Sequence, residues 1–335
     1  MDRTQFRESV FKRDNNKCVM CGAPAVDAHH IIDRSLFEDG GYHLDNGVSL
    51  CAEHHIEAEE TKISCSKLRE KACITKVYLP DYFDFEEQYD HWGNIVNTNG
   101  TRLKGELFEQ PNVQKALKDS LHLFLPYFKY QKTFHLSNSP GLQKNDKKLR
   151  DESAFLGKEI VGTIKMDGEN TNMYPDYIHA RSIDSVGHES RTWVKALHGS
   201  IAYQIPQGYR ICGENLFAKH SIHYMHLTSF FNVFSIWNDK NEALCWDETV
   251  EYCELLDLTT VPVFYRGIYD PEAITKAFEK YCNESKDLVE GYVIRTSGVI
   301  HFSKFRKNVA KWVRKGHVQT EHNWMQQKVI PNKIS

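Results

Sequence analysis

The chain carries the segment IKMDGEN at residues 164–170, which places Lys165 two residues before an Asp-Gly pair. The run 160–165 before that pair is rich in β-branched residues, and Asp-Gly favours a tight turn. We therefore predict a strand that ends near Lys165 and a turn at Gly168. On its own this pattern fits a surface hairpin as well as a nucleophilic lysine, whose amine must lose its proton before it attacks.

Further short motifs surround this segment in a fixed order. The segment KTFHLSNSPG lies upstream at 132–141, and ARS, CGEN, FFNVFSIW, EGYVIR and VAKWVR follow at 180–182, 212–215, 230–237, 290–295 and 309–314. Their order and spacing resemble the motifs of the covalent nucleotidyltransferases, which include DNA ligases, RNA ligases and mRNA capping enzymes. The upstream segment is similar to the nucleotide-embracing segment of the RNA ligase branch.

This resemblance implies a role for each matching residue. Lys165 would attack the α-phosphorus of ATP and carry AMP, with burial and neighbouring cations lowering its pKa. Glu214 and Glu290 would hold Mg²⁺ or Mn²⁺ and help to fix the ribose. Phe234 would stack on adenine, and Lys311 would contact the α-phosphate while pyrophosphate leaves.

The resemblance also implies a wider nucleotide-binding set. Arg181 would contact the ribose or the 5′-phosphate of the acceptor strand. Either Lys304 or Arg314 would be the second cation beside Lys311, and Ser235 replaces the acid usual after the stacking aromatic residue. The whole implied set is Lys165, Asp167, Gly168, Arg181, Glu214, Phe234, Glu290, Lys304, Lys311 and Arg314.

Two short Cys/His motifs near the start of the chain contain residues that commonly bind zinc. Cys18-x-x-Cys21 and Cys51-x-x-His54 lie about 30 residues apart, a spacing that can close one tetrahedral Zn²⁺ site. The chain has nine cysteines and begins without an apolar export signal, so we expect most thiols to be reduced. We therefore predict that Cys18, Cys21, Cys51 and His54 bind zinc.

A second cluster lies between and beside these two motifs. It consists of DAHHII at 27–32, DNG at 45–47 and the His pair at 54–55. Residues 1 to about 70 resemble the HNH (ββα-metal) nuclease family. The resemblance implies that His30 is the general base, that Asn46 orients it, and that His29 and His55 hold a divalent cation at the scissile phosphate. DNA and RNA are both considered as polymers for this module.

The helical turn after this histidine pair is acidic, with Glu57, Glu59 and Glu60 where a cation would help to hold phosphate. Two alternatives therefore remain for the module. It is either a metal-dependent nuclease or a zinc-stapled nucleic-acid-binding domain.

Three parts are expected along the chain: an HNH/zinc domain at 1–75, a linker region with helical pieces at 76–125, and a nucleotidyltransferase domain at 126–335. The predicted fold class is α+β, with ATP-grasp-like antiparallel sheets and helices after a small zinc-bound ββα-metal domain. Predicted helices are 6–11, 52–69, 84–89, 111–123, 190–202, 249–256 and 271–282. Predicted strands are 27–32, 46–51, 160–165, 177–182, 209–214, 230–237, 291–296 and 299–305.

The composition is that of an ordinary soluble protein, with 335 residues, 41% hydrophobic and 26% charged. No apolar run approaches the ~20 residues that span a bilayer, so we expect a cytoplasmic protein without a membrane partner. The net charge of −3 indicates no partner, but residues 301–317 hold six Lys+Arg and no acid. That stretch is either a solvated face or a phosphate contact.

Together these features predict an ATP-dependent RNA ligase that uses ATP, Mg²⁺ or Mn²⁺, and Zn²⁺. It would seal 5′-phosphate and 3′-hydroxyl RNA ends through lysyl-AMP in RNA repair, with tRNA as one substrate considered and end-healing enzymes as partners. Only 24 residues follow Lys311, fewer than the ~70–100 of the OB barrel that DNA ligases and capping enzymes append. A DNA ligase and a non-catalytic nucleic-acid-binding protein are the alternatives.

Overall fold

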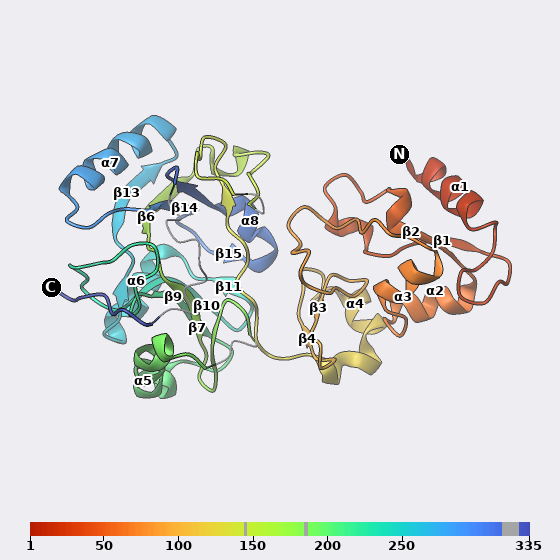
Figure 1. Cartoon of the computed structure of the whole chain (residues 1–335), viewed down its shortest axis with the longest axis horizontal. Coiled ribbons are helices and arrows are strands. Elements are labelled where there is room, and N and C mark those ends of the chain that lie inside the picture. The colour runs from red at the N-terminus through yellow and green to blue at the C-terminus, as the bar shows by residue number, and fades with distance from the viewer. Residues whose placement is uncertain (144–145, 184–186, 317–327) are drawn as a thin grey trace. The chain divides into compact units, whose positions relative to one another are not determined.

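A computed structural model describes residues 1–143, 146–183, 187–316 and 328–335. The chain forms two compact units, Met1–Phe128 and Lys129–Ser335, and each is described by itself (Figure 1). No helix among the described residues is long and apolar enough to cross a membrane. The fold is mixed α+β, as predicted from the sequence.

In unit 1, the first helix is followed along the chain by a ββα arrangement. It contains α1 (Arg3–Arg13), β1 (Asp27–His30), η1 (Arg34–Leu36), η2 (Leu44–Asn46), β2 (Gly47–Leu50), α2 (Ala52–Glu59) and α3 (Cys65–Lys71). The Asp2 carboxylate accepts from the Gln5 backbone N–H in a capping box that begins α1. β1 and β2 pair antiparallel, with His29 opposite Val48.

The single helix predicted over 52–69 is wrong, because the chain breaks into α2 and α3. Thr61 has a φ of +58°, a left-handed conformation that ends the helical path. Ser64 then caps α3 by accepting from the Lys67 backbone N–H at 3.1 Å.

Residues 76–125, where we expected a linker region, contribute to the core of unit 1. They contain β3 (Ile95–Val96), β4 (Arg102–Leu103), α4 (Pro111–Ala116) and η3 (Lys118–Leu123). Phe83, Trp92 and Leu117 are buried in one cluster with Leu50. The helix predicted over 84–89 is wrong, since this stretch forms turns in which the Asp84 backbone N–H donates to the Tyr89 hydroxyl at 2.8 Å.

Unit 2 contains two sheets, and residues of both line one cavity. The first sheet has the order β13 (Val263–Ile268), β6 (Glu159–Lys165), β14 (Gly291–Thr296), β16 (Val309–Val313) and β5 (Phe134–His135). Its strands pair antiparallel except for β16 and β5, which run parallel with Lys311 opposite His135. The buried side chains of Ile160, Ile164 and Ile294 fill the core on this sheet.

The second sheet has the order β15 (Ile300–His301), β11 (Glu242–Ala243), β10 (Phe231–Trp237), β9 (Arg210–Asn215), β7 (Glu169–Met173) and β8 (Ile178–Ala180), with β12 (Thr259–Thr260) beside β10. The helices are α5 (Thr192–Ile201), α6 (Trp246–Leu255), α7 (Pro271–Glu284) and α8 (Phe305–Asn308). Short 3₁₀ turns are η4 (Ser153–Phe155), η5 (Glu189–Arg191), η6 (Ala202–Gln204) and η7 (Phe302–Lys304).

Most predicted elements of unit 2 are confirmed to within a few residues, but the strand predicted over 299–305 is mostly wrong. It ends after β15, because the His301 imidazole accepts from the Ser303 backbone N–H and starts η7. Six strands of unit 2 were not predicted: β5, β7, β11, β12, β13 and β16. The segment IKMDGEN crosses from the first sheet to the second, since β6 ends at Lys165 and β7 begins at Glu169.

Candidate active site

A cavity of about 590 Å³ lies in unit 2 and is lined by residues of both sheets. Its walls include Lys165, Glu214, Phe234 and Lys311, four of the residues singled out from the sequence. They come from β6, β9, β10 and β16, so segments far apart along the chain meet here.

Lys165 is held by a carboxylate of the neighbouring strand. Gly291 of β14 lies opposite Lys165 of β6, which places Glu290 at the same end of the sheet. The Lys165 Nζ donates to Glu290 Oε2 at 2.6 Å, and Glu290 is buried. A Cβ at position 291 would lie 2.1 Å from the Trp312 carbonyl oxygen, so only glycine lets these strands approach so closely.

The electrostatics around Lys165 differ from our expectation. Burial by itself lowers the pKa of Lys165, but the charges of Glu290 and Glu214 outweigh it and hold that pKa above its ordinary value. The prediction of a lowered pKa is wrong for this structure, because carboxylates and not cations are the nearest charges.

Glu214 forms the other acidic wall of the site. Its Oε1 accepts from the Gly168 backbone N–H at 3.1 Å. Burial, with help from the charge of Glu290 and against that of Lys165, raises the pKa of Glu214 to about 8. The carboxylates of Glu214 and Glu290 form a donor set of the kind that Mg²⁺ and Mn²⁺ prefer.

The Asp-Gly pair has a positioning role in this structure. The Asp167 Oδ2 accepts from the Ile222 backbone N–H at 2.7 Å, and the Asp167 backbone N–H donates to the Tyr224 hydroxyl at 2.9 Å. Among the described residues, Gly168 lines the cavity but Asp167 does not. The carboxylate of Asp167 therefore faces the segment between β9 and β10, although we expected it to bind nucleotide.

Phe234 enters the cavity at an irregularity of β10. The pairing of β10 with β9 shifts register between Val233 and Ser235, as in a β-bulge, which re-aims a side chain. The Phe234 ring lies 5.1 Å from the ring of Tyr130, edge to face. Ser235 is buried and also lines the cavity. An aromatic face beside a small polar group suits a purine base.

Lys311 of β16 lines the cavity within a chain of polar contacts. Its Nζ donates to Asp146 Oδ1 at 3.2 Å, and Asp146 Oδ2 lies 3.0 Å from His135 Nε2. Burial is the main cause that lowers the pKa of Lys311, and the charge of Lys165 adds to it against the charge of Asp146. Neither Asp146 nor its contact with Lys311 was found from the sequence.

The remaining predicted cations divide into two groups. Arg181 lines the cavity directly after β8, whereas neither Lys304 nor Arg314 is among the described lining residues. Arg191, which was not predicted, also lines the cavity. Its guanidinium donates to the Glu169 carboxylate at 2.7 Å and 2.5 Å. No local motif marks Arg191, so the sequence offered no signal for it. The cavity wall also includes Tyr130, Lys132, His220 and Arg295.

Residues 158–313 match the family model described as RNA ligase. The matched segment runs from the residue before β6 to the last residue of β16. It therefore contains the four cavity residues Lys165, Glu214, Phe234 and Lys311, together with Glu290. Unit 1 lies outside it. No curated protein matches the chain.

Several solved ligases are distantly similar. An archaeal ATP-dependent RNA ligase is 14% identical with a TM-score of 0.40, over 79% of this chain and 64% of that chain. A Naegleria gruberi RNA ligase variant with ATP and Mn is 14% identical with a TM-score of 0.36, over 55% of each chain. An Aquifex aeolicus protein assigned as an ATP-dependent DNA ligase is 17% identical with a TM-score of 0.36, over 56% of this chain and 50% of that chain. This chain thus spans about half to two thirds of the length of these proteins.

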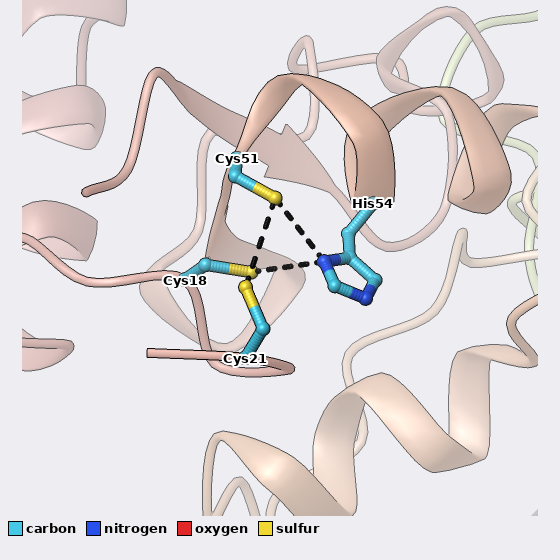
Figure 2. Close-up of side chains that lie close together, drawn as sticks. All are labelled: Cys18, Cys21, Cys51 and His54. Atoms are coloured by element: carbon cyan, nitrogen blue, oxygen red, sulfur yellow. Dashed lines mark hydrogen bonds between the residues drawn. The ribbon is translucent and has the colours of Figure 1, made fainter. Parts of the chain in front are cut away.

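Outside the matched segment, unit 1 holds a cluster of metal-ligand side chains. The ligand atoms of Cys18, Cys21, Cys51 and His54 all lie within 4.8 Å of one another, and Figure 2 shows them converging on one point. The Sγ atoms of Cys21 and Cys51 are 3.9 Å apart, and Cys18 Sγ lies 3.6 Å from His54 Nδ1. Tetrahedral zinc with ordinary bond lengths separates its ligands by about 3.6–3.8 Å. The donor set therefore fits Zn²⁺ in chemistry and in size.

The predicted nuclease histidines lie on β1 and α2. The rings of His29 and His55 are 5.1 Å apart, and His55 Nε2 lies 3.4 Å from Asp27 Oδ2. The Nε2 of buried His29 has no hydrogen-bond partner among the described residues. His91, which was not predicted, stacks on His29 with ring centres 4.6 Å apart.

Asn46 holds the loop between β1 and β2. Its side chain accepts from the Ile32 backbone N–H and donates to the Ile32 and Gly41 carbonyls, at 3.0, 3.0 and 3.2 Å. These bonds reach the loop backbone and not the His30 ring. Burial lowers the pKa of His30 to about 4, so its imidazole is neutral near pH 7.

The acidic turn of α2 is engaged by neighbouring side chains. His54 Nε2 lies 4.0 Å from Glu57, His55 Nε2 lies 3.7 Å from Glu59, and Lys62 donates to Glu60 at 2.6 Å. Of these three partners only Lys62 carries a fixed positive charge, so this contact offsets the charge of Glu60.

Proposed function

We propose that the chain is an ATP-dependent RNA ligase that joins 5′-phosphate and 3′-hydroxyl RNA ends through lysyl-AMP at Lys165. The observation that carries the proposal is the Lys165–Glu290 contact of 2.6 Å beside a cavity that Lys165, Phe234 and Lys311 line. The match of residues 158–313 to the RNA ligase model supports the same assignment.

In the first step, the Lys165 Nζ attacks the α-phosphorus of ATP. An N–P bond forms, the bond from the α-phosphorus to the bridging oxygen breaks, and pyrophosphate leaves. Glu290 is placed to accept the proton that Nζ must lose, because the two groups are already hydrogen-bonded. Lys311 stabilises the charge that develops on the phosphate as pyrophosphate departs.

Glu214 and Glu290 are the residues that would hold a divalent cation in this site. Such a cation supplies positive charge that opposes the protonated form of Lys165 and neutralises phosphate oxygens. Phe234 would receive the adenine ring, and Arg181 would contact the ribose or the acceptor phosphate. Lys132, Arg191 and Arg295 also line the cavity.

Two further displacements complete the reaction. An oxygen of the RNA 5′-phosphate attacks the AMP phosphorus, and the Lys165 amine leaves. The 3′-hydroxyl then attacks the 5′-phosphorus, its proton is lost, and AMP leaves as the strands are joined. An enzyme of this kind acts in RNA repair, where broken tRNA is one substrate and enzymes that prepare the ends are partners.

The test is sealing of a nick with a 5′-phosphate and a 3′-hydroxyl in matched RNA and DNA duplexes. We expect RNA to be sealed at least tenfold faster than DNA and Lys165→Ala to seal neither. Equal sealing of both polymers would replace the proposal with a DNA ligase.

For unit 1 we propose a structural Zn²⁺ at Cys18, Cys21, Cys51 and His54 and a metal-dependent nuclease centre at His29, His30, Asn46 and His55. The unpartnered Nε2 of buried His29, close to His55, favours this centre, and a neutral His30 has the form that a general base requires.

The nuclease proposal is tested by incubating RNA and DNA with Mg²⁺ or Mn²⁺ and comparing wild type with His30→Ala. Cleavage that is lost in His30→Ala supports the nuclease. If neither polymer is cut above the His30→Ala background, unit 1 is a zinc-stapled nucleic-acid-binding module.

A further inference from the structure

The segment 216–227, here named the site loop, joins β9 to β10 and holds the Asp-Gly turn of IKMDGEN. Two of its groups bind Asp167: the Ile222 backbone N–H and the Tyr224 hydroxyl, at 2.7 and 2.9 Å. Ile222 and Tyr224 are both buried in the core beneath the first sheet. Because Asp167 is two residues from Lys165, a shift of this loop moves the end of β6.

The site loop is itself held by a segment more than a hundred residues later, 328–335, here named the clasp. Backbone hydrogen bonds run from Lys219 N to the Ile330 carbonyl at 2.7 Å and from Asn332 N to the Phe217 carbonyl at 2.9 Å. Others join Lys333 N to the Tyr224 carbonyl and Leu227 N to the Lys333 carbonyl, each at 3.0 Å. The clasp therefore pairs with the loop along most of its length.

Asn332 is the buried centre of this contact, with 3% of its surface exposed. Its Oδ1 accepts from the Tyr224 backbone N–H at 2.9 Å, while its Nδ2 donates to the Leu216 and Ala218 carbonyls at 2.8 and 3.3 Å. One amide side chain thus joins both ends of the loop and satisfies backbone groups that would otherwise be buried without partners.

A second carboxylate, that of Asp287, also binds the site loop. Asp287 accepts from the backbone N–H groups of Met225 and His226, each at 3.0 Å. Asp287 precedes Glu290, the partner of Lys165, by three residues. The site loop therefore lies between the two segments that fix Lys165, one through Asp167 and the other through Glu290.

We infer that the clasp positions the adenylylation site and that Asn332 is its key positioning residue. The inference rests on the proposed lysyl-AMP chemistry at Lys165. Asn332 acts through the site loop on Asp167, so its loss would misplace Lys165 without removing any group that binds ATP. Such an effect lowers the rate of the chemical step more than it weakens ATP binding.

The experiment compares AMP transfer to Lys165 in the full chain and in the variants Asn332→Ala, Asn332→Asp and Lys333→Ala. We expect Asn332→Ala to lower kcat by at least tenfold with KM for ATP changed less than threefold, because ~1 Å of misplacement costs about 10²-fold in rate. Asn332→Asp keeps the acceptor for the Tyr224 backbone N–H, so its kcat should lie between those of wild type and Asn332→Ala. Lys333 is the control, since its side chain is exposed on the same segment.

Hydrogen exchange provides a readout that does not depend on ligase activity. In Asn332→Ala, the amides of Asp167, Ile222 and Tyr224 should exchange faster while those of β14 stay protected. The inference would be overturned if Asn332→Ala showed unchanged exchange at Asp167 and a normal kcat. It would also be overturned if Asn332→Ala lost activity and all of unit 2 exchanged faster, because the effect would then not be confined to the Asp-Gly turn and the site loop. If wild type forms no AMP adduct, the proposed function fails, and exchange at Asp167 still decides whether the clasp positions this turn.

Discussion

Replacing Gly168 with alanine should displace Lys165 with little change in the chemistry of the site. A Cβ at position 168 would lie 2.4 Å from the Asn215 carbonyl oxygen and 2.9 Å from Leu216 Cδ2. Real Cβ contacts stay above 3.0 Å, so the turn must move away from β9 by about 0.6 Å at least. The hydrogen bond from Gly168 N to Glu214, now 3.1 Å, would then stretch to about 3.7 Å and be lost.

The expected consequence is a slower AMP transfer and a less stable unit 2. Since ~1 Å of misplacement costs about 10²-fold, a shift of this size should slow the transfer by about tenfold or more. Overpacking of this kind costs ~1–3 kcal/mol of folding free energy. The assay is single-turnover transfer of radiolabelled AMP from ATP, with the unfolding midpoint measured on the same samples.

Gly199→Ala is the matched control, because no atom lies within 4 Å of a Cβ at position 199 of α5. It should leave AMP transfer unchanged and slightly stabilise the helix. A Gly168→Ala protein that transfers AMP within twofold of wild type would refute the claim that this close approach positions Lys165.

Three further predictions test charge, metal and loop structure. The folded-state pKa of Glu214, about 8, lies above its ordinary 4.5, so the proton stabilises the folded state and wild type should lose stability as pH rises between these values. In EDTA, Glu214→Gln should therefore unfold at a higher temperature than wild type at pH 8.5, with the difference shrinking toward pH 5, and parallel pH profiles would contradict this. Cys18→Ala should lose the one zinc per chain that metal analysis is expected to find in wild type, whereas unchanged zinc would exclude Cys18 as a ligand. Asn46→Ala should destabilise unit 1 by about 2–4 kcal/mol in denaturant titrations, because it leaves buried backbone groups of the loop unpaired, and a loss below about 0.5 kcal/mol would show that water replaces those bonds.

Four of the strands that line or border the cavity were predictable because short runs with β-branched and aromatic residues mark them. β6, β9, β10 and β14 lie within a few residues of the predicted ranges. β7 was missed because its sequence, ENTNM, is polar, although it pairs with β9 on one side and β8 on the other. Its burial comes from the tertiary fold, which a short window of sequence does not reveal.

The sequence predicted which residues belong to the site but not which residues they contact. The sequence indicated Lys165, Glu214 and Glu290 as one group, yet the register that places Glu290 beside Lys165 depends on the pairing of β6 with β14. The raised pKa of Lys165 follows from that register. Asp146 and Asn332 carry no local signal, since each reaches its partner from a distant part of the chain.

The most direct test of the central claim is the mass of the purified protein after incubation with ATP and Mg²⁺. The account predicts a gain of one AMP, mapped to Lys165 by peptide analysis, and no gain in Lys165→Ala. Attachment of AMP to another residue, or an adduct formed from GTP but not from ATP, would contradict it.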